Sequence, residues 1–447
     1  MPKESAHGKQ LSEREGRSLS TAVPFKEALR FWIKLGFINF GGPAGQIAIM
    51  QHELVDAKKW IPQRQFIRAL NFCMILPGPE AQQLAIYIGW LLHGTLGGVL
   101  AGAFFVIPSI LVLLGLSWMA AASSDVPAIG GLLYGVQPVV IAIVASAVLR
   151  IGKKTLCHRW LFVYAALAFI AIHFLHLPFP YVIGAAALSG LILQRWRPDV
   201  YLSCELLHRA SENGTETLSS PEPRPSLRRN LFLVAAFLAL WSIPIALLWA
   251  LPGLPDVLTR QALFFTKAAF VTFGGAYAVL SYIADMAVNH FAWLDAHQMV
   301  QGLGLAESTP GPLIMVTQFV GFFGAWNHHG ALSPLLAGTL GALVTTYMTF
   351  LPCFFFILLG APYIERLSEN QRLQAALVGV TSAVVGVILN LAVFFGEKVL
   401  IPEHGAFDFF AAGLATVSFA LSMKFRLPLH YLVPVGALAG MARNLLF

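Results

Sequence analysis

The sequence predicts an all-α polytopic membrane protein, with two homologous halves that form an inverted repeat of about 10–13 membrane segments with broken or re-entrant helices. The first observation behind this prediction is composition: of 447 residues, 57% are hydrophobic and only 11% are charged, and the mean hydropathy is +0.71. A soluble domain carries about 25% charged residues, so this chain is suited to lipid rather than water. The second observation is an internal repeat at a constant offset.

The repeat consists of Gly- and Pro-containing breaks inside apolar sequence. The stretch Phe40-Gly41-Gly42 … Trp60 … Pro77-Gly78-Pro79 returns as Phe273-Gly274-Gly275 … Trp293 … Pro310-Gly311-Pro312. The offset is 233 residues at Gly41, Trp60 and Gly78 alike, so the two copies align without a gap. A duplicated pair of broken hydrophobic segments indicates a secondary transporter with its substrate site between the two halves.

The membrane segments follow from length and hydropathy. Apolar segments of about 17–25 residues are long enough to cross a hydrocarbon core of about 30 Å. Beyond the first Pro-Gly-Pro break we expect them at 96–120, 130–150, 160–176, 178–194, 231–251, 259–283, 300–325, 331–360, 373–395, 405–423 and 428–445.

The stretch from residue 25 to residue 92 has two interpretations. It either crosses the membrane completely, or it forms two hairpins, 25–57 and 63–92, that each enter and leave on one side. The hairpins are favoured because they keep the basic loop between Lys58 and Arg68 in the cytoplasm, as the positive-inside rule requires.

Polar stretches divide the chain. Residues 1–24 have no cleavable apolar stretch, so we expect a cytoplasmic tail rather than a signal peptide. Residues 195–230 are rich in Arg, Ser, Glu and Pro, which is typical of a polar cytoplasmic linker. A first transporter repeat at 25–194, a connecting transmembrane helix at 231–251 and a second repeat at 258–447 complete the organisation.

The connecting helix turns the second repeat upside down, because it has no counterpart before the first. Counted in order, the basic loops at 150–159, 195–230, 366–372 and 424–426 then share one side of the membrane. Loops without Lys or Arg, near Asp125 and at 285–297 and 326–329, share the other. The positive-inside rule makes the basic side cytoplasmic, which suits a multi-pass protein of the cell inner membrane.

The breaks themselves are candidate anion sites. Backbone freed inside lipid needs protein or a water-filled cavity as its partner. A helix that restarts at a Pro presents free N–H groups and a positive dipole end, and glycine lets a ligand approach the backbone. The break residues expected to bind substrate are Gly41, Gly42, Pro77, Gly78, Gly274, Gly275, Pro310 and Gly311. The alternative is close helix packing or a kink, against which the repetition at constant offset counts.

Two lysines precede the breaks at equivalent positions. Lys34 and Lys267 lie six residues before Phe40 and Phe273, about 9 Å along a helix. A lysine within apolar sequence is costly and usually faces a polar pathway, so both are expected as counter-charges for a dianion. The alternative is a lysine near a helix end, whose ammonium group extends to the interface.

Uncharged and acidic side chains beside the breaks complete the predicted site. Hydrogen bonds to oxyanion oxygens are expected from Asn39, Gln82, Gln83 and Thr272, which could equally bond neighbouring helices. Glu80 and Glu307, next to the Pro-Gly-Pro sequences, are candidate proton carriers whose protonation relieves repulsion as an anion enters. For Glu80 the alternative is a residue that the helix dipole favours.

Several function classes lack their signals. There is no HExxH, paired-Asp or nucleophile-elbow motif, so an enzyme is not expected, and no GxxxxGK[ST] sequence for ATP. The cysteines are scattered without CxxC spacing, which predicts packing roles and neither a disulfide framework nor a metal site. No cofactor and no nucleic-acid partner are expected. The oligomeric state is left open, a homodimer included.

These residues resemble the chromate ion transporter family in its long, two-domain form. The matching pieces are Phe40-Gly41-Gly42-Pro43, Leu76-Pro77-Gly78-Pro79-Glu80-Ala81-Gln82-Gln83, Phe105-Val106-Ile107-Pro108-Ser109, Phe273-Gly274-Gly275 and Ser308-Thr309-Pro310-Gly311-Pro312. The resemblance covers roughly residues 25–395. It implies export of chromate from the cytoplasm and chromate resistance, with sulfate as a competing ion. The alternative is an importer or exchanger of sulfate or another oxyanion, and the membrane potential or a proton gradient would supply the energy.

Overall fold

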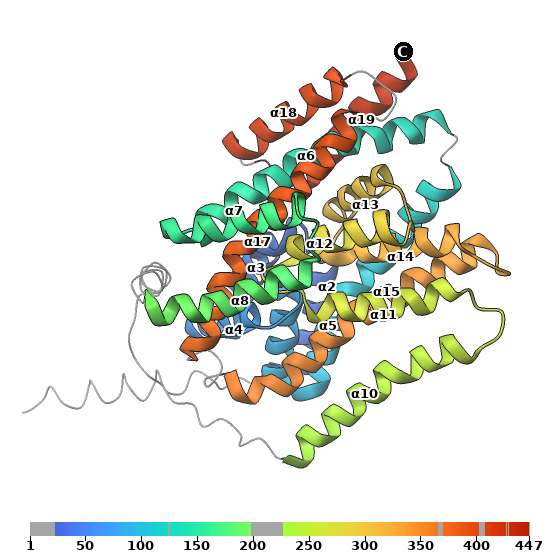
Figure 1. Ribbon diagram of the computed structural model, residues 1–447. Coiled ribbons are helices and arrows are strands. Elements are labelled where there is room, and N and C mark those ends of the chain that lie inside the picture. Colours follow the sequence, from blue (N-terminus) through green and yellow to red (C-terminus); the bar gives the residue numbers. More distant parts are fainter. Residues whose placement is uncertain are drawn as a thin grey trace, which may run out of the picture.

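The computed structural model describes residues 23–123, 126–197, 227–364, 370–401, 407–425, 427 and 429–446. The expected tail up to residue 22 and the linker between 198 and 226 lie outside these residues. All regular structure within them is helical, as predicted (Figure 1). The first half contains α2 (Phe25–Ile38), α3 (Gly42–Gln51), α4 (Gln63–Ile75), α5 (Glu80–Ala122), α6 (Pro127–Thr155), α7 (Arg159–His173) and α8 (Phe179–Trp196).

The second half repeats this order after one connecting helix. Its helices are α11 (Asp256–Phe270), α12 (Ala276–Asp285), α13 (Ala296–Ser308), α14 (Val316–Asn327), α15 (Pro334–Gly360), α17 (Gln371–Leu400), α18 (Phe409–Lys424) and α19 (Leu429–Leu446), with α10 (Leu227–Ala250) between the halves. The bounds of α4 and α13 differ by 233 residues at both ends. Later helices keep the order at larger offsets, 244 between Gly135 and Gly379 and 250 between Gly190 and Gly440, because loops lengthen. The two-half repeat is therefore confirmed.

Residues 25–92 form the two hairpins. Lys58, which follows the first hairpin, lies 3.7 Å from Glu27 at its start. His93, which follows the second, has its Nε2 2.8 Å from the Val23 carbonyl oxygen. Both hairpins therefore begin and end at the same end of the molecule, which decides between the two interpretations of this stretch.

α5 is two antiparallel helices joined by a tight turn. Gly94 has φ +63° and lies outside helical geometry, and a Cβ on Gly97 would lie 2.3 Å from the Gly89 carbonyl oxygen. In the second half, where α14 and α15 are separate, a Cβ on Gly341 would lie 2.3 Å from the Gly321 carbonyl oxygen. Glycine at these positions lets the helix backbones meet, as small residues do in membrane bundles.

The two halves exchange their last helices. α18 and α19 of the second half pack along α6, and α7 and α8 of the first pack along α17 (Figure 1). A Cβ on Gly135 would lie 2.1 Å from the Gly436 carbonyl oxygen, and one on Gly379 would lie 2.3 Å from the Ala186 carbonyl oxygen. These contacts are equivalent under the repeat, so a pseudo-two-fold axis relates the halves.

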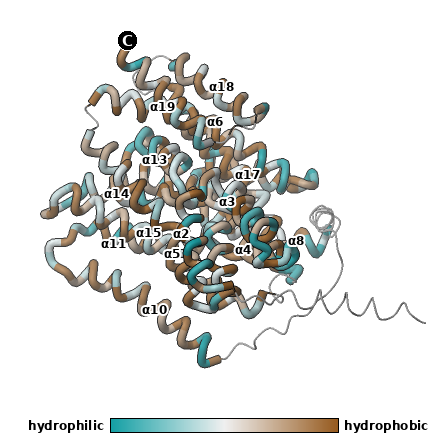
Figure 2. Tube along the Cα trace, turned by 180° about the vertical axis from the view of Figure 1, so that it is seen from behind, coloured by the Kyte–Doolittle hydropathy of each residue, from teal (hydrophilic) through white to brown (hydrophobic). Residues whose placement is uncertain are grey.

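α10 lies at the edge of this body, where it packs on α11 and α15, and it has hydrophobic residues along its length and a hydrophilic start (Figures 1 and 2). Its 24 residues extend about 36 Å, and only 6% of its most apolar window is buried. Arg229 near its start lies 5.9 Å from the Trp90 ring, where the first-half hairpins end. The other end of α10 leads to Pro255. Pro255 lies 3.4 Å from a Cβ placed on Gly330, and Gly330 is where the second-half hairpins end. The two halves therefore begin at opposite ends of a helix of membrane length.

Among the residues that the structure describes, five helices are long and apolar enough to cross a membrane: Glu80–Ala122, Pro127–Thr155, Leu227–Ala250, Pro334–Tyr363 and Gln371–Leu400. The segments expected at 259–283 and 300–325 each divide into two helices at their break. α8 continues to Trp196 and α10 begins at Leu227, so the linker is shorter than expected at both ends. The assignment of packing roles to every cysteine is wrong for Cys157, which is disulfide-bonded, a feature that its spacing did not indicate.

Candidate functional site

At the interface between the halves, each Pro-Gly-Pro break crosses the Gly-Gly break of the other half. The Gly78 N–H donates to the Thr272 carbonyl oxygen at 2.9 Å, and the Gly311 N–H donates to the Asn39 carbonyl oxygen at 2.9 Å. Both donors and both acceptors are equivalent at the 233-residue offset. Each half thus satisfies backbone groups that the break of the other half sets free, which is how broken helices are tolerated inside a membrane protein.

Gly78 and Gly311 lie at the centre of this crossing and are tightly packed. Their φ values are +128° and +120°. A Cβ on Gly78 would lie 2.8 Å from Cys353 Sγ, and one on Gly311 would lie 2.5 Å from Ser109 Cβ. Ser109 and Cys353 are themselves equivalent at the 244-residue offset. We expected the breaks to line a cavity; in this conformation side chains of α5 and α15 fill the space against these two glycines.

The other two breaks start short helices with open N-termini. Gly41 and Gly42, at the start of α3, have φ +91° and +66°, and Gly274 and Gly275, before α12, have φ +78° and +96°. Neither helix has a side-chain hydrogen bond at its N-cap. Their first N–H groups and positive dipole ends therefore remain available to an anion.

A carboxyl group faces each of these helix starts. Glu307 Oε2 lies 3.9 Å from a Cβ on Gly42, and Glu80 Oε1 lies 3.2 Å from a Cβ on Gly275. Tyr277, in the first turn of α12, donates its hydroxyl hydrogen bond to Glu307 Oε1. Each predicted proton carrier therefore lies beside a break of the other half.

The predicted amides also gather here. Asn39, Gln82 and Gln83 are fully buried. Gln83 Nε2 donates to the Pro77 carbonyl oxygen at 2.7 Å, whereas the Thr272 hydroxyl donates within its own helix to Ala268. Beside the breaks, the described residues with a buried polar atom that lacks a hydrogen-bond partner are Asn39, Gln46, Glu80, Gln82, Gln83, Ser109 and Glu307. A polar ligand or water would satisfy such atoms.

Sequence reasoning missed Gln46 and Tyr277. Gln46 Nε2 donates to the Gly311 carbonyl oxygen at 2.6 Å, from the first half to the second break. Neither residue has a polar equivalent in the other repeat, since Val279 and Ala44 stand there. A search for repeated residues could not find them.

The structure does not bring Lys34 and Lys267 to the breaks. Both are exposed, and Lys34 Nζ lies 3.0 Å from Glu53 Oε1 with 59% of its side chain accessible. Six residues are about 1.7 helical turns, so these side chains leave the helix on another face than the break. The expectation that they are counter-charges at the breaks is corrected accordingly.

α6 contributes the cations instead. Arg150 acts electrostatically on Tyr277 and Glu307, and Lys154 acts on Glu80. Arg150 also donates to Ser422 Oγ at 3.3 Å. The sequence feature that could have indicated these cations is the group of basic residues at the end of the 130–150 segment, which we assigned only to a cytoplasmic loop.

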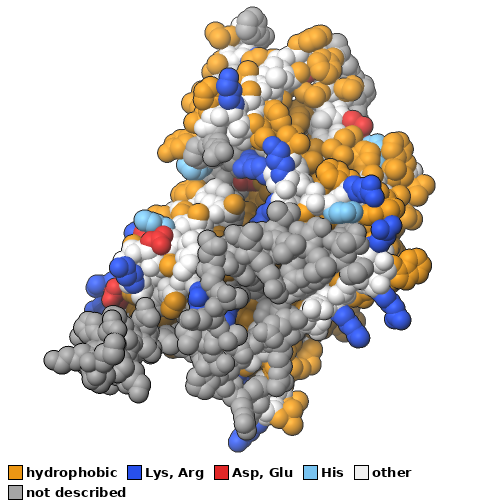
Figure 3. Space-filling view, turned by 90° about the vertical axis from the view of Figure 1, so that its left-hand side faces the viewer, with side chains coloured by type: hydrophobic (Ala, Val, Ile, Leu, Met, Phe, Trp, Pro, Cys, Tyr) orange, Lys and Arg blue, Asp and Glu red, His pale blue; other side chains and the backbone are white. Residues whose placement is uncertain are grey.

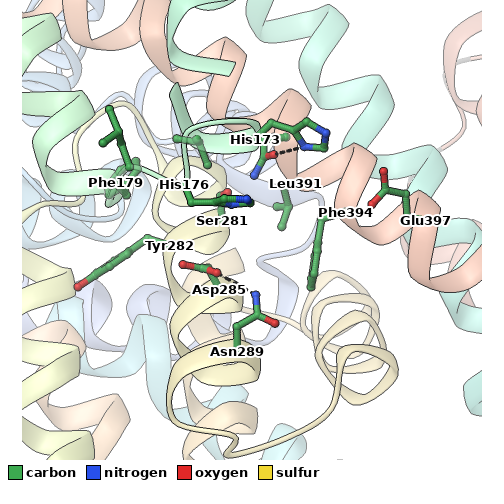
Figure 4. Close-up of a pocket in the computed structure, with 13 residues that line it drawn as sticks. His173, His176, Phe179, Ser281, Tyr282, Asp285, Asn289, Leu391, Phe394 and Glu397 are labelled. Atoms are coloured by element: carbon green, nitrogen blue, oxygen red, sulfur yellow. Dashed lines mark hydrogen bonds between the residues drawn. The ribbon is translucent and has the colours of Figure 1, made fainter. Parts of the chain in front are cut away.

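A cavity of about 220 Å³ lies farther from the breaks, between the end of α7, the start of α8, α12 and α17 (Figure 4). His173 Nδ1 lies 3.1 Å from Asn390 Oδ1, and Asn289 donates to Asp285 at 2.9 Å. Figure 4 shows Glu397 at its edge. Acidic, amide and imidazole groups therefore line this cavity together with apolar side chains.

Two of the cavity's positions on α17 have basic repeat equivalents on α6. At the 244-residue offset, Phe394 and Glu397 correspond to Arg150 and Lys153. Leu156, after α6, packs with Leu161 and Val378 near the start of α17, whereas the cavity lies near the end of α17. Gly152, between Arg150 and Lys153, has its Cβ position 3.5 Å from Val385 in the middle of α17, whereas Glu397 lies near the end of that helix. Figure 3 shows Lys and Arg side chains spread over the face turned to the viewer, among hydrophobic ones.

A repeated helical membrane protein, whose broken helices cross at a buried polar centre with open helix N-termini, has the architecture of a membrane transporter. The chain belongs to the family described as Chromate transporter, whose profile matches residues 26–191 and 259–441.

Curated relatives agree over almost the whole chain. A chromate transport protein of Pseudomonas aeruginosa is 33% identical over 98% of this chain and 97% of its own length. A probable chromate transport protein of Synechococcus elongatus is 28% identical over 94% of this chain and 95% of its own. A chromate transport protein of Cupriavidus metallidurans is 28% identical over 94% of this chain and 94% of its own length. No solved structure matches the chain.

Proposed function

We propose that this protein is a secondary active transporter that exports chromate from the cytoplasm across the inner membrane and thereby confers chromate resistance. The observation that supports this most is the crossing of the breaks, which places the open starts of α3 and α12 beside buried, unpaired polar side chains. Chromate as the ion comes from the relatives' names.

The proposed site uses donors that suit a tetrahedral dianion. N–H groups at Gly42 and Gly275 lead the helix starts, and the amides of Asn39, Gln82 and Gln83 lie around them. Arg150 and Lys154 offset part of the charge without contacting the breaks directly. Rocking of one half against the other about the crossing would then open the site to either side in turn.

The proposed orientation places the first-half hairpins, the ends of α6 and α8 and the linker in the cytoplasm. Two features support it: the halves begin at opposite ends of α10, and exposed basic residues lie at the ends of α6 and α8, at Arg150, Lys154, Arg195 and Arg197. The basic positions of α6 then attract a dianion from the cytoplasm.

A second candidate is an importer or exchanger of sulfate. The proposed donors recognise the geometry and charge of a tetrahedral oxyanion rather than the metal inside it, and this favours sulfate as a competing ion. Export and import share one alternating-access cycle, whose direction follows the driving forces.

The test is uptake of radiolabelled chromate into inside-out membrane vesicles, competed with sulfate, because export from the cell appears there as uptake. We expect saturable uptake that unlabelled chromate abolishes and sulfate reduces. Vesicles containing Gly78→Val are the matched control, with protein amount measured in the membrane. Sulfate uptake that chromate does not inhibit would favour the second candidate, and uptake equal to that of empty membranes would reject both.

A further inference from the structure

Two glutamates lie close to the helix starts of the opposite half. Glu307 of the second half lies with its Oε2 3.9 Å from a Cβ on Gly42, the first residue of α3. Glu80 of the first half lies with its Oε1 3.2 Å from a Cβ on Gly275, directly before α12. The two carboxyl groups are therefore at the places where the candidate site would hold an anion.

Each of these helix starts carries unpaired backbone donors. α3 and α12 have ten residues each and follow a glycine with positive φ. The first N–H groups of a helix have no partner within it, and the dipole adds a partial positive charge, so an anion is stabilised there. A carboxylate and an incoming oxyanion compete for the same donors.

A second observation points to a ligand at the start of α3. Glu307 is 3% exposed, and its Oε1 accepts a hydrogen bond from Tyr277 while its Oε2 has no partner. The Asn39 side chain is fully buried and neither of its amide atoms is hydrogen-bonded. A buried polar atom without a partner destabilises the folded state, so these atoms favour a state in which a polar ligand satisfies them.

We propose that Glu307 and Glu80 are tethered anions, which stand beside the starts of α3 and α12 when the site is empty and compete there with the transported oxyanion. This rests on the proposed function, because it assigns competing groups to that same site. When a carboxylate binds a proton it becomes neutral, and both its attraction to the helix start and its repulsion of the oxyanion are lost. The proton returns to water when the oxyanion leaves and the carboxylate takes its place again.

The charges around the two carboxyl groups explain why protons matter. The charged and titratable groups facing Glu307 are Tyr277 and Arg150, and those within electrostatic range of Glu80 are Lys154 and Cys73, with Cys353 next to Cys73. Two carboxylates offset the two cations. A bound dianion therefore adds two uncompensated charges unless the carboxyl groups take up protons.

The test measures binding of sulfate and chromate to the purified full-length protein in lipid nanodiscs, by isothermal titration at acidic, neutral and alkaline pH. Sulfate stays a dianion across this range, so its pH dependence reports the protein. Wild-type protein should bind it more tightly at acidic pH. Glu307→Gln and Glu80→Gln keep the shape and remove the charge, so each should bind about 5- to 10-fold more tightly at neutral pH. The double variant should lose the pH dependence.

Glu27→Gln is the matched control, because this exposed carboxyl pairs with Lys58 away from the breaks. Thermal unfolding of each variant is followed as well, and Glu307→Asp, which keeps the charge on a shorter side chain, should retain a pH dependence. Wild-type binding with unchanged affinity and pH dependence in the Gln variants, or a loss of stability alone, would show that the carboxyls only cap helices. If no protein, wild type included, binds either ion, the proposed function itself fails.

Discussion

Gly78 combines a left-handed backbone with a close contact, and this makes a direct prediction. Its φ is +128°, and an added Cβ would lie 2.7 Å from Gln83 Nε2 and 2.8 Å from Cys353 Sγ. Strained backbone of this kind costs about 1–3 kcal/mol, before any clash is counted. Gly78→Ala should therefore lower chromate uptake about tenfold or more while the protein still reaches the membrane.

Gly115→Ala is the matched control for that change. Gly115 lies in α5, the helix that follows Gly78, and nothing lies within 4 Å of a Cβ placed on it. Uptake by this variant should therefore stay near the wild-type rate. If Gly78→Ala takes up chromate at the wild-type rate, Gly78 has only a packing role, which alanine can also fill.

Arg150 and Lys34 give opposite expectations. Arg150 acts electrostatically on Glu307, whereas Lys34 is exposed and paired with Glu53, an arrangement typically worth about 0–1 kcal/mol. Arg150→Gln should raise the KM for oxyanion uptake several-fold, and Lys34→Gln should leave it within about twofold. Initial uptake rates over a range of chromate concentrations measure both. Equal damage from the two changes would restore Lys34 to the transport path.

At this scale, sequence could predict residues whose role is local. A glycine with positive φ or a proline before a helix is set by its own backbone, so Gly42, Gly78 and their copies were placed correctly at the breaks. The pairing of Glu307 with Gly42 depends on how the halves cross, and no local pattern contains that information. Lys34 was misplaced because a count along the helix fixes distance but not the face on which a side chain emerges.

Between helices, close backbone contacts hold the exchanged pairs together. Gly135 on α6 meets Gly436 on α19 with only 2.1 Å for an added Cβ, and α6 also carries Arg150. Gly135→Leu should therefore separate α6 from α19 and lower the thermal unfolding midpoint by several degrees, since overpacking costs about 1–3 kcal/mol. Gly184→Leu on α8 is the control, because nothing lies within 4 Å of its Cβ position. Equal midpoints in the two variants would contradict this packing role.

The order of the helices was largely predictable, and their partners were not. The constant offset of 233 residues fixes the sequence of hairpins in both halves, and the basic loop around Lys58 already favoured hairpins over full spans. That α7 and α8 pack on α17, and not on α6, follows from tertiary contacts between halves. Apolar periodicity is the same for either partner, so it cannot choose between them.

For the molecule as a whole, the inverted arrangement predicts sidedness. The halves begin at opposite ends of α10, so the linker and the turn after α12 should face opposite sides of the membrane. Cysteines introduced singly at Ser219 and Asn289 should react with a membrane-impermeant thiol reagent from opposite sides of oriented vesicles. Labelling of both from the same side would contradict the inverted repeat. Wild-type protein, without an introduced cysteine, is the control for labelling of the native thiols.

The charge of the transported ion sets the energetics. An inside-negative potential drives anions outward by about 2.3 kcal/mol per charge per 100 mV, so a dianion gains about 4.6 kcal/mol. That corresponds to a gradient of about 10³-fold, which is enough for export without ATP. The two carboxyl groups at the breaks would add a pH term if they exchange protons with the site.

Energised inside-out vesicles are interior-positive, so this field should draw chromate into them. Collapsing the potential with valinomycin and potassium should cut accumulation severalfold, while the initial exchange of labelled for unlabelled chromate, which moves no net charge, should persist. Glu307→Gln should flatten the dependence of accumulation on pH, because its side chain can no longer carry a proton. Empty-membrane vesicles control for leakage, and Glu27→Gln controls for the loss of a carboxyl elsewhere. Accumulation that ignores both potential and pH but requires ATP would overturn secondary transport.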